Sequence, residues 1–462
     1  MFLHMNRYIS LYFLLILLIA PIHLLGLDSY YYWDWSRHLA LSYYDGSPMI
    51  AYFIRIATLL FGDTLFALNL VTIVSTALTS FIIYKTARLC LNREASYVAV
   101  LIWLFSPLVT LDLINQTTYD TPLTLFWALT LYFTIKYIQF NRNQDLYYTG
   151  LSIGLMLLSK YSGIVLVLAL LIFLVATPYR RLFKSRHFYL ALTLTIIVFS
   201  PVILWNAQHD WASIRYQLST HQTQNAHNTI GSILHTFFNI FLPAINFLFI
   251  PPALYLSKSA PRKSPIFYLC LIICITFVLF YLFVAGKATI RGYWLSQYII
   301  TASLLAGYCY QEWAYRNSTY LLIVFYVLTS GIILMNNTTL FSFGYSKKLA
   351  YYQSIQQLNH SNEKLPNIVI TPGWFEARML FFLKNKPTIF TFDCGSMQNQ
   401  YRYWSPNLNT LDEVLYIDTF DRLSCVKKYF TQCQSLHLPA TIDEKKGKPI
   451  IYAYRCGNRL DT

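Results

Sequence analysis

The chain has 462 residues, of which 56% are hydrophobic and only 12% are charged. Soluble domains average about 25% charged residues, so this chain has too little polar surface for a water-soluble globular fold. The formal net charge is +15, but the basic residues lie in short clusters between apolar runs, which indicates membrane topology and excludes a nucleic-acid-binding class. The composition predicts a multi-span α-helical membrane protein.

Apolar runs recur along the first three quarters of the chain. Each is long enough to cross a hydrocarbon core of ~30 Å, and together they predict about eleven transmembrane helices. The first follows Arg7 and shows no small-residue cleavage site before Asp28, so we interpret it as a retained signal anchor. The predicted spans are Tyr8–Leu27, Leu65–Tyr84, Tyr97–Leu111, Leu123–Ile138, Leu146–Leu158, Ile164–Ala176, Phe188–Trp205, Ile233–Tyr255, Ile266–Ala285, Trp294–Gln311 and Tyr320–Met335.

The loops between these spans alternate in charge, as the positive-inside rule requires. With a cytoplasmic N-terminus, the cytoplasmic loops hold Lys85, Arg88, Arg93, Lys136, Arg142, Arg180, Arg181, Lys184, Arg186, Lys258, Arg262, Lys263 and Arg316. The outside loops hold Asp28, Asp34, Asp45, Asp112, Asp120, His209, Asp210, His221 and His227. The alternation requires two helices between Leu146 and Ala176, divided at Lys160, and places the tail after Ser342 outside the cytoplasm.

The tail differs from the rest because charge returns and apolar runs shorten. We therefore predict a membrane domain at residues 1–340, with a long outside loop at 28–63, and a small α/β domain outside the cytoplasm at 341–462. The predicted strands are Asn367–Thr371, Thr388–Phe392, Val414–Ile417 and Ile450–Tyr454, with a helix at Phe375–Leu383.

Four cysteines lie in the tail: Cys394, Cys425, Cys433 and Cys456. An even number outside the cytoplasm favours one or two disulfides. Four cysteines allow three pairings, and the sequence does not choose among them. A zinc site is the alternative, but no CxxC spacing supports it.

The outside loop at 28–63 carries the first candidate site residues. Residues Tyr30–Leu41 have near-helical aromatic spacing, which predicts an amphipathic helix on the membrane surface with solvated Asp34, Arg37 and His38. Asp28, at the end of the first span, is either a helix N-cap or a carboxylate that accepts a proton from a substrate. Asp45, before Gly46, is either a turn former or a second acidic group.

Cations in the outside loops are candidates for binding an anion. Lys160 interrupts a long apolar stretch, which is costly unless an anion accompanies it. We expect a phosphate there, and snorkelling to the interface is the alternative. Arg215, Lys287 and Arg291 are candidates to converge on the same anion, or are plain surface charges.

Several stretches, in this order, resemble a known family. Asp28 is followed by WSRHLALSYYDGSPM, FGDTLFALNL, YDTPLTLFWAL from Tyr119, LLSKYSG from Leu157 and SPVILWNAQHDWASIRYQ from Ser200. This order resembles the bacterial GT-C glycosyltransferases that use polyprenyl-phosphate sugars, including the aminoarabinose transferase of lipid A and the protein O-mannosyltransferase-like enzymes. The resemblance covers roughly Leu24 to Ala306 and is weak in the tail.

The resemblance implies roles for particular residues. Asp28 matches the proposed catalytic base, Asp45 the second acidic residue of the first outside loop, and Asp120 the acidic residue after the third span. Lys160 matches the lysine that faces the lipid phosphate. Two departures stand out: Asp28 is followed by Ser29 where many members have Glu, and the motif at Asp45 lacks the usual basic residue. The second departure leaves phosphate contacts in this loop open.

No cofactor is certain from the sequence. His209, His221 and His227 fit no standard zinc spacing, and whether Asp28 or Asp45 binds a divalent metal ion with a histidine, as the resemblance allows, stays open. The absence of GxGxxG, P-loop and GxSxG motifs gives no support to nucleotide-driven or serine-hydrolase chemistry.

The expected function is that of a glycosyltransferase in the bacterial inner membrane. It would move a sugar, with inversion, from a polyprenyl-phosphate carrier to a lipid, glycan or protein acceptor on the periplasmic face. The alternatives are a transporter or lipid flippase, which should show charges within its spans and repeated halves, and a non-catalytic scaffold.

Overall fold

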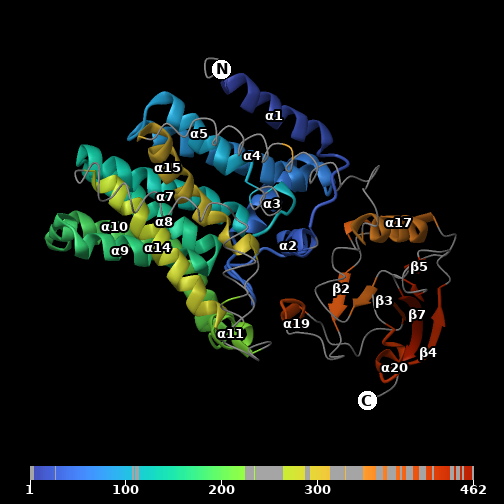
Figure 1. The fold of residues 1–462 in the computed structure, drawn as a ribbon. Coiled ribbons are helices and arrows are strands. Elements are labelled where there is room, and N and C mark those ends of the chain that lie inside the picture. The colour runs from blue at the N-terminus through green and yellow to red at the C-terminus, as the bar shows by residue number, and fades with distance from the viewer. Residues whose placement is uncertain are drawn as a thin grey trace.

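The computed structural model describes residues 5–26, 28–106, 114–223, 264–286, 292–312 and 347–360, together with positions 109, 231, 234 and 328. In the tail it also describes 368–371, 381–384, 388–391, 399–404, 413–418, 421–436, 442–443, 448–449 and 452–459. A bundle of helices and a smaller mixed α/β unit lie side by side (Figure 1). The helices before the tail are α1 (Met5–Ile19), α2 (Asp28–Arg37), α3 (Met49–Phe61), α4 (Leu65–Arg88), α5 (Arg93–Leu104), α7 (Asp120–Phe140), α8 (Asn143–Ser159), α9 (Ile164–Ala176), α10 (Arg186–Gln208), α11 (Ala212–Thr223), α14 (Pro265–Ala285) and α15 (Ser296–Glu312).

Three of the described helices are long and apolar enough to cross a membrane alone, namely α4, α10 and α14. A fourth span results if α9 and the short 3₁₀ helix η4 (Pro178–Lys184) after it are counted together. Of the predicted spans, Ile233–Tyr255 and Tyr320–Met335 lie outside the described residues apart from positions 234 and 328. The total of about eleven spans therefore stays a prediction.

The predicted division at Lys160 is confirmed. Helix α8 ends at Ser159, Lys160 is extended, and the 3₁₀ helix η3 (Tyr161–Gly163) leads into α9. One extended residue breaks the helical hydrogen-bond ladder and lets the chain reverse direction. The two helices are thus separate, as the charge alternation required.

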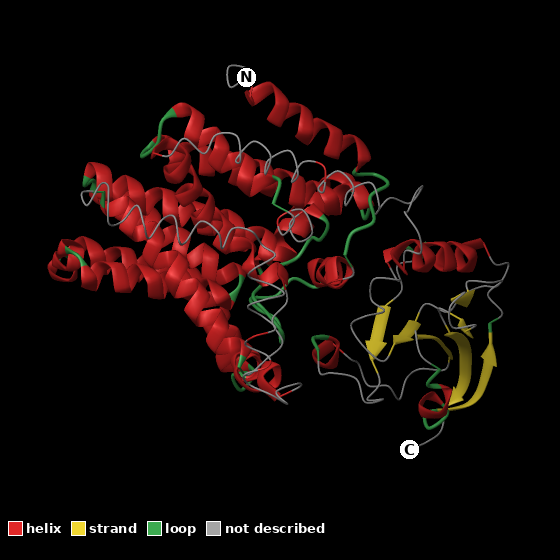
Figure 2. Cartoon of the chain, in the orientation of Figure 1, coloured by secondary structure: helices red, strands yellow, loops and turns green. Residues whose placement is uncertain are grey.

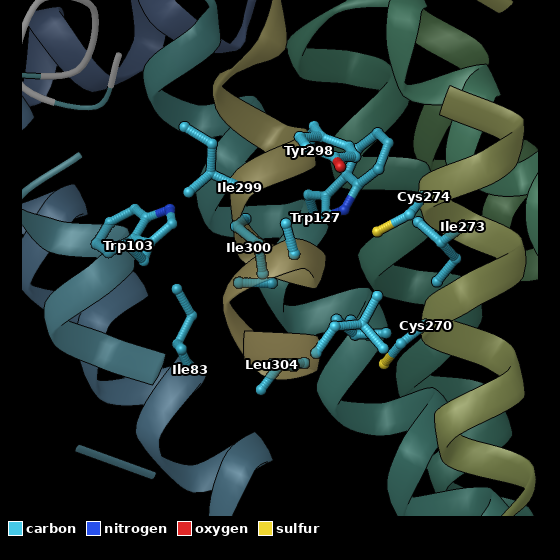
Figure 3. Close-up of a cluster of buried hydrophobic side chains, with 14 of the residues drawn as sticks. Ile83, Trp103, Trp127, Cys270, Ile273, Cys274, Tyr298, Ile299, Ile300 and Leu304 are labelled. Carbon is cyan, nitrogen blue, oxygen red and sulfur yellow. The ribbon is translucent and has the colours of Figure 1, made fainter. Parts of the chain in front are cut away.

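The core of the bundle is formed by apolar side chains that many of the described helices contribute. Figure 3 shows Ile83 of α4, Trp103 of α5 and Trp127 of α7 facing Cys274 of α14 and Leu304 of α15. All of them are buried. Because lipid tails are as apolar as these side chains, close packing rather than transfer from water holds such helices together.

Helices α8 and α10 approach each other closely through two glycines. A Cβ atom at Gly150 would overlap the backbone oxygen of Ala191, and one at Gly154 would lie 2.7 Å from Cβ of Val198. The Thr195 hydroxyl donates to the Gly150 carbonyl at 2.8 Å across this contact. Small residues spaced four positions apart along a helix, together with a hydroxyl that donates a hydrogen bond to the neighbouring helix, are typical of packed membrane helices.

The prediction of an interfacial helix at Tyr30–Leu41 is wrong. Every residue of α2 from Ser29 to Ser36 is buried, and the Asp34 carboxylate, which was expected in solvent, is 2% exposed and pairs with Arg37 at 3.0 Å. His38 is exposed, as expected. The tail covers α2: Tyr30 and Trp33 contact the Phe381 ring at centroid distances of 5.2 and 5.0 Å.

The apolar surface helix of the outside loop is instead α3. Its side chains Ile56, Leu59, Leu60 and Phe61 are exposed, whereas Ile50, Ala51 and Ile54 on the other face are fully buried. The sequence analysis did not identify α3, although its MIAYFIRIATLLF stretch carries apolar residues on both faces.

The described strands of the tail form a five-stranded sheet in the order β2-β1-β3-β7-β4. Figure 2 shows the strands of the tail in yellow. Strand β1 (Ile368–Thr371) lies parallel to β2 (Thr388–Thr391) and β3 (Glu413–Asp418), and β7 (Tyr452–Arg459) lies antiparallel to β3 and β4 (Phe430–Ser435). The smaller elements are α17 (Lys347–His360), α19 (Tyr401–Trp404), α20 (Leu423–Val426), β5 (Ile442–Asp443) and β6 (Lys448–Pro449).

Four predicted strands are confirmed within a few residues; β4 was not predicted. The predicted helix at Phe375–Leu383 lies mostly outside the described residues, as does the boundary at 341.

A disulfide joins Cys433 of β4 to Cys456 of β7. These two cysteines are directly opposite in the antiparallel register. Cys425 is also disulfide-bonded, and Cys394 lies outside the described residues. The tail is therefore cross-linked, as its cysteine content predicted.

Candidate active site

The antiparallel helices α7 and α8 bring Asp120 and Lys160 together, since α7 begins where α8 ends. The Lys160 ammonium lies 2.7 and 2.8 Å from the two carboxylate oxygens of Asp120. The amide of Gln297 on α15 donates to the same carboxylate at 3.2 Å. Asp120 opens α7, so the positive end of the helix dipole also stabilises its charge.

Lys160 therefore has an anionic partner within the protein. Its ammonium also lies over the rings of Tyr119 and Trp294, 4.4 and 5.9 Å from their centroids. The Lys160 side chain is 16% exposed, whereas that of Asp120 is 1% exposed. An ammonium has three donors, so the face of Lys160 that does not meet Asp120 is able to receive a second anion.

Asp28 opens α2 and is held next to the loop that precedes α7. The backbone N–H of Thr117 donates to the Ser29 hydroxyl at 2.8 Å, and the N–H of Gly26 donates to the Asn115 carbonyl at 2.6 Å. Glycine is required at position 26 because a Cβ there would overlap the Gln116 side chain. Asp28 is half-buried, so it is anchored by its neighbours and still accessible.

Asp45 is held by a hydroxyl and an amide from two other helices. The Tyr31 hydroxyl of α2 donates to both carboxylate oxygens at 3.0 and 2.9 Å, and the Gln217 amide of α11 donates to the Asp45 carbonyl at 2.9 Å. Loss of water around this carboxyl raises its pKa to about 7, with a smaller contribution from the charge of Asp28, while the Tyr31 hydrogen bond opposes the shift. Asp45 thus changes charge near neutral pH.

Two tyrosines connect the carboxylates of the outside loop with Lys160. The Tyr32 ring meets the Tyr119 ring edge-on at 5.1 Å, and the Lys160 ammonium lies 4.4 Å from the centroid of the same Tyr119 ring. Burial raises the pKa of Tyr32 well above its ordinary value, and the charges of Asp28 and Asp45 raise it further. Ser47 also donates to the carbonyl of Leu157, near the end of α8, at 3.2 Å. Asp28, Asp45, Asp120 and Lys160 therefore gather at one end of the bundle.

The tail contributes one residue that sequence reasoning missed. The backbone N–H of Gln400 donates to the Tyr31 hydroxyl at 2.9 Å, and the Gln400 side chain accepts from the N–H of Tyr44 at 2.6 Å. Because Tyr31 accepts from Gln400, its own proton points to Asp45. The surrounding NQYRYW stretch carries an aromatic cluster but no motif that would have identified this contact.

The structure describes only some of the remaining candidates. Arg215 is exposed on α11, and Lys287 and Arg291 lie outside the described residues. His209 stacks on Trp205 with ring centroids 4.0 Å apart; the side chain of His221 and all of His227 are not described. Within the described part of the chain, no three His, Cys, Asp or Glu side chains meet as a metal site would require.

Part of the chain matches known sequences. Residues 45–205 match the family model described as dolichyl-phosphate-mannose-protein mannosyltransferase. The lipid A galacturonosyltransferase RgtD of Rhizobium johnstonii is 29% identical over 193 residues. That alignment covers 41% of this chain and 40% of RgtD, so the chain matches about two fifths of that relative's length. The resemblance expected from the sequence motifs is confirmed.

Comparison of structures covers nearly the whole chain. The fold is similar to that of ArnT from Cupriavidus metallidurans, with a TM-score of 0.72 and 12% identity over 97% of both chains. ArnT bound to undecaprenyl phosphate gives a TM-score of 0.69 with 13% identity, over 97% of this chain and 98% of that one. The Archaeoglobus fulgidus oligosaccharyltransferase gives 0.50 with 12% identity, over 89% of this chain and 69% of the other.

The Lys160–Asp120 pair predicts a particular pattern of stability. Lys160→Met should lower the free energy of unfolding by about 3–5 kcal/mol, because it leaves a buried carboxylate without its cation. Lys160→Met combined with Asp120→Leu should recover most of that loss. Thermal unfolding in detergent measures both variants. A Lys160→Met protein as stable as the parent chain would contradict the pairing.

The raised pKa of the Asp45 carboxyl predicts that the stability of the protein depends on pH. The Asp45 pKa is raised on folding, so its contribution is full below the unfolded value of about 4 and is lost as the pH rises through about 7. Asp45→Asn should therefore gain stability relative to the parent chain as the pH rises from about 4 to about 7. Melting temperatures measured across this range check the sign, and parallel curves for the two proteins would refute it.

The two kinds of comparison agree with the geometry and with each other. The matched family region, residues 45–205, contains Asp45, Asp120 and Lys160, three of the four clustered residues. The structural likeness, at 12% identity, establishes the fold. Residues 45–205 therefore match the dolichyl-phosphate-mannose-protein mannosyltransferase model, and the chain as a whole has a fold similar to that of ArnT.

Proposed function

We propose that this protein is a membrane glycosyltransferase that transfers a sugar from a polyprenyl-phosphate carrier to a lipid A-type acceptor. The observation that carries the proposal is the meeting of Asp28, Asp45 and the Lys160–Asp120 pair at one end of an apolar helix bundle. In this proposal, the phosphate of the lipid carrier reaches this end of the bundle from the membrane, and the polar acceptor enters from water. The similarity to a lipid A galacturonosyltransferase supports this class of acceptor.

The reaction needs a nucleophile and a stabilised leaving group. An acceptor hydroxyl oxygen forms a bond to the anomeric carbon of the sugar while the bond from that carbon to the phosphate oxygen breaks. The hydroxyl proton passes to a carboxylate, and the carrier leaves as polyprenyl phosphate. A positioned base and a cation beside the developing phosphate charge are the groups that accelerate such a step.

Asp28 fits the role of the base better than the other carboxylates. Asp28 and Asp45 are both half-buried, whereas Asp120 is fully buried and held by Lys160 and Gln297. Asp45 is engaged through both oxygens by Tyr31 and is partly protonated at neutral pH. Asp45 would orient the sugar or the acceptor, and Asp120 would hold Lys160.

Lys160 would stabilise the leaving phosphate. Its ammonium is held at a fixed place by Asp120 and two aromatic rings, and its partial exposure leaves room for an oxygen of the phosphate. A cation held in position before the reaction needs no reorganisation when negative charge develops on the leaving group. Arg215, Lys287 and Arg291 remain candidates for further contacts with this anion.

The topology follows the charge pattern of the loops. We place the chain in the bacterial inner membrane, with the N-terminus in the cytoplasm and the carboxylate cluster and the tail of residues 341–462 in the periplasm. A transporter or flippase should carry charges within its spans. The acidic and basic residues of α4 and α10 lie only in their end turns, and α14 has none.

Asp28→Asn should keep the fold and reduce transfer by a factor of about 10² or more, the usual contribution of a general base. Mass spectrometry of envelope lipids from cells that carry the parent or variant chain measures the transfer as the gain of one sugar mass. Asp210→Asn is the matched control, since Asp210 is exposed and adopts a positive φ of 51° that asparagine tolerates. Normal transfer by folded Asp28→Asn would refute this role.

A second ion pair of the same hairpin provides a control for Lys160. Lys136 of α7 pairs with Asp145 of α8 at 3.1 Å, at the opposite end of the two helices. The double variant Lys160→Met/Asp120→Leu should be folded and inactive, whereas Lys136→Met/Asp145→Leu should be folded and active in the same lipid assay. Equal activity of the two double variants would exclude Lys160 from phosphate binding.

A further inference from the structure

An apolar pocket, open on one side, lies between helices of the bundle. It has a volume of about 330 Å³ and lies among α7, α8, α9, α10 and η4. Apolar side chains such as Ile153, Leu170, Phe188 and Ile196 line it, and none of the clustered carboxylates or Lys160 does. Such a lining offers water almost no hydrogen-bond partners, so the pocket is suited to a hydrocarbon chain.

The wall at one end of this cavity is the 3₁₀ helix η4. The chain bends by 104° between α9 and η4, so η4 runs across the ends of the helices. Its residues Tyr179 and Leu182 line the cavity, while Arg180, Arg181 and Lys184 are exposed. The same segment thus has one apolar side on the cavity and one cationic side.

These cations are not neutralised by the protein that the structure describes. None of the ion pairs among the described residues includes Arg180, Arg181, Lys184 or the neighbouring Arg186. This segment therefore places four positive charges, within seven residues, next to an apolar pocket. That arrangement is suited to bind a molecule with an anionic head group and an apolar chain. The charges select the head group, and the cavity accepts a hydrocarbon chain.

We propose that this is a binding site for an anionic glycerophospholipid, with the phosphate on Arg180, Arg181 and Lys184 and part of one acyl chain in the cavity. The site is distinct from that of the sugar carrier. Helix α9 begins at Ile164, just after Lys160, and ends at Ala176, just before η4, which separates the two cationic places by about 20 Å at 1.5 Å per residue. The bound lipid would contact η4, α8 and α10 at once and so stabilise their packing.

The test measures lipid binding to the purified full-length protein by native mass spectrometry and by thermal unfolding, with phosphatidylglycerol and phosphatidylcholine as the added lipids. Phosphatidylglycerol should bind more tightly and raise the melting temperature more. Arg180→Gln/Arg181→Gln should weaken phosphatidylglycerol binding about tenfold or more, since each cation near an anionic lipid contributes appreciably. The double variant Lys85→Gln/Arg93→Gln, which removes two exposed cations from α4 and α5, should bind like the parent chain.

Ile153→Phe tests the cavity independently of charge. It places a larger apolar side chain in the cavity and should weaken binding of both lipids while the cations remain. Equal binding of the two lipids by the parent chain, an equal loss in the Lys85 and Arg93 control, or competition by polyprenyl phosphate at this site would each overturn the proposal. Because no readout depends on sugar transfer, the result is independent of the proposed function.

Discussion

The ion pair between Lys160 and Asp120 is the interaction on which the candidate site depends. A charge in an apolar helix bundle is costly, and two opposite charges in contact are far less so. The pair can form only because α8 stops at Ser159 and Lys160 adopts an extended backbone beside the start of α7. The ion pair therefore sets how α7 and α8 are aligned along each other, at the end of the bundle where the other carboxylates lie.

The same requirement explains why the site is crowded with tyrosines and amides. Tyr119 lies under Lys160, Tyr32 meets Tyr119, and Tyr31 holds Asp45. Each phenol combines an apolar ring, which packs against helices, with a hydroxyl that binds a charged group. The high tyrosine content, which composition alone associates with membrane interfaces, therefore also serves the polar cluster.

Sequence reasoning predicted those features that depend on local pattern. Helix positions followed from apolar runs, the break at Lys160 from charge alternation, and four strands of the tail from short apolar stretches. It was wrong about α2, because a helix with polar and aromatic residues is also suited to burial when a second unit covers it. Asp34 is in this way buried beside Arg37. Gln400 could not be predicted, since only the folded chain shows which distant residue lies against Tyr31.

The contact of Gln400 with Tyr31 joins residues 369 positions apart in the chain. The hydrogen-bond network around Asp45 is therefore incomplete until nearly the whole polypeptide has been synthesised and the tail has folded back over α2. In a growing chain, Asp45 and Lys160 would already be present in the membrane part, but Tyr31 would still lack its hydrogen bond from Gln400. Maturation of the enzyme would then be coupled to completion of the polypeptide, and a truncated product would be inserted in the membrane but inert.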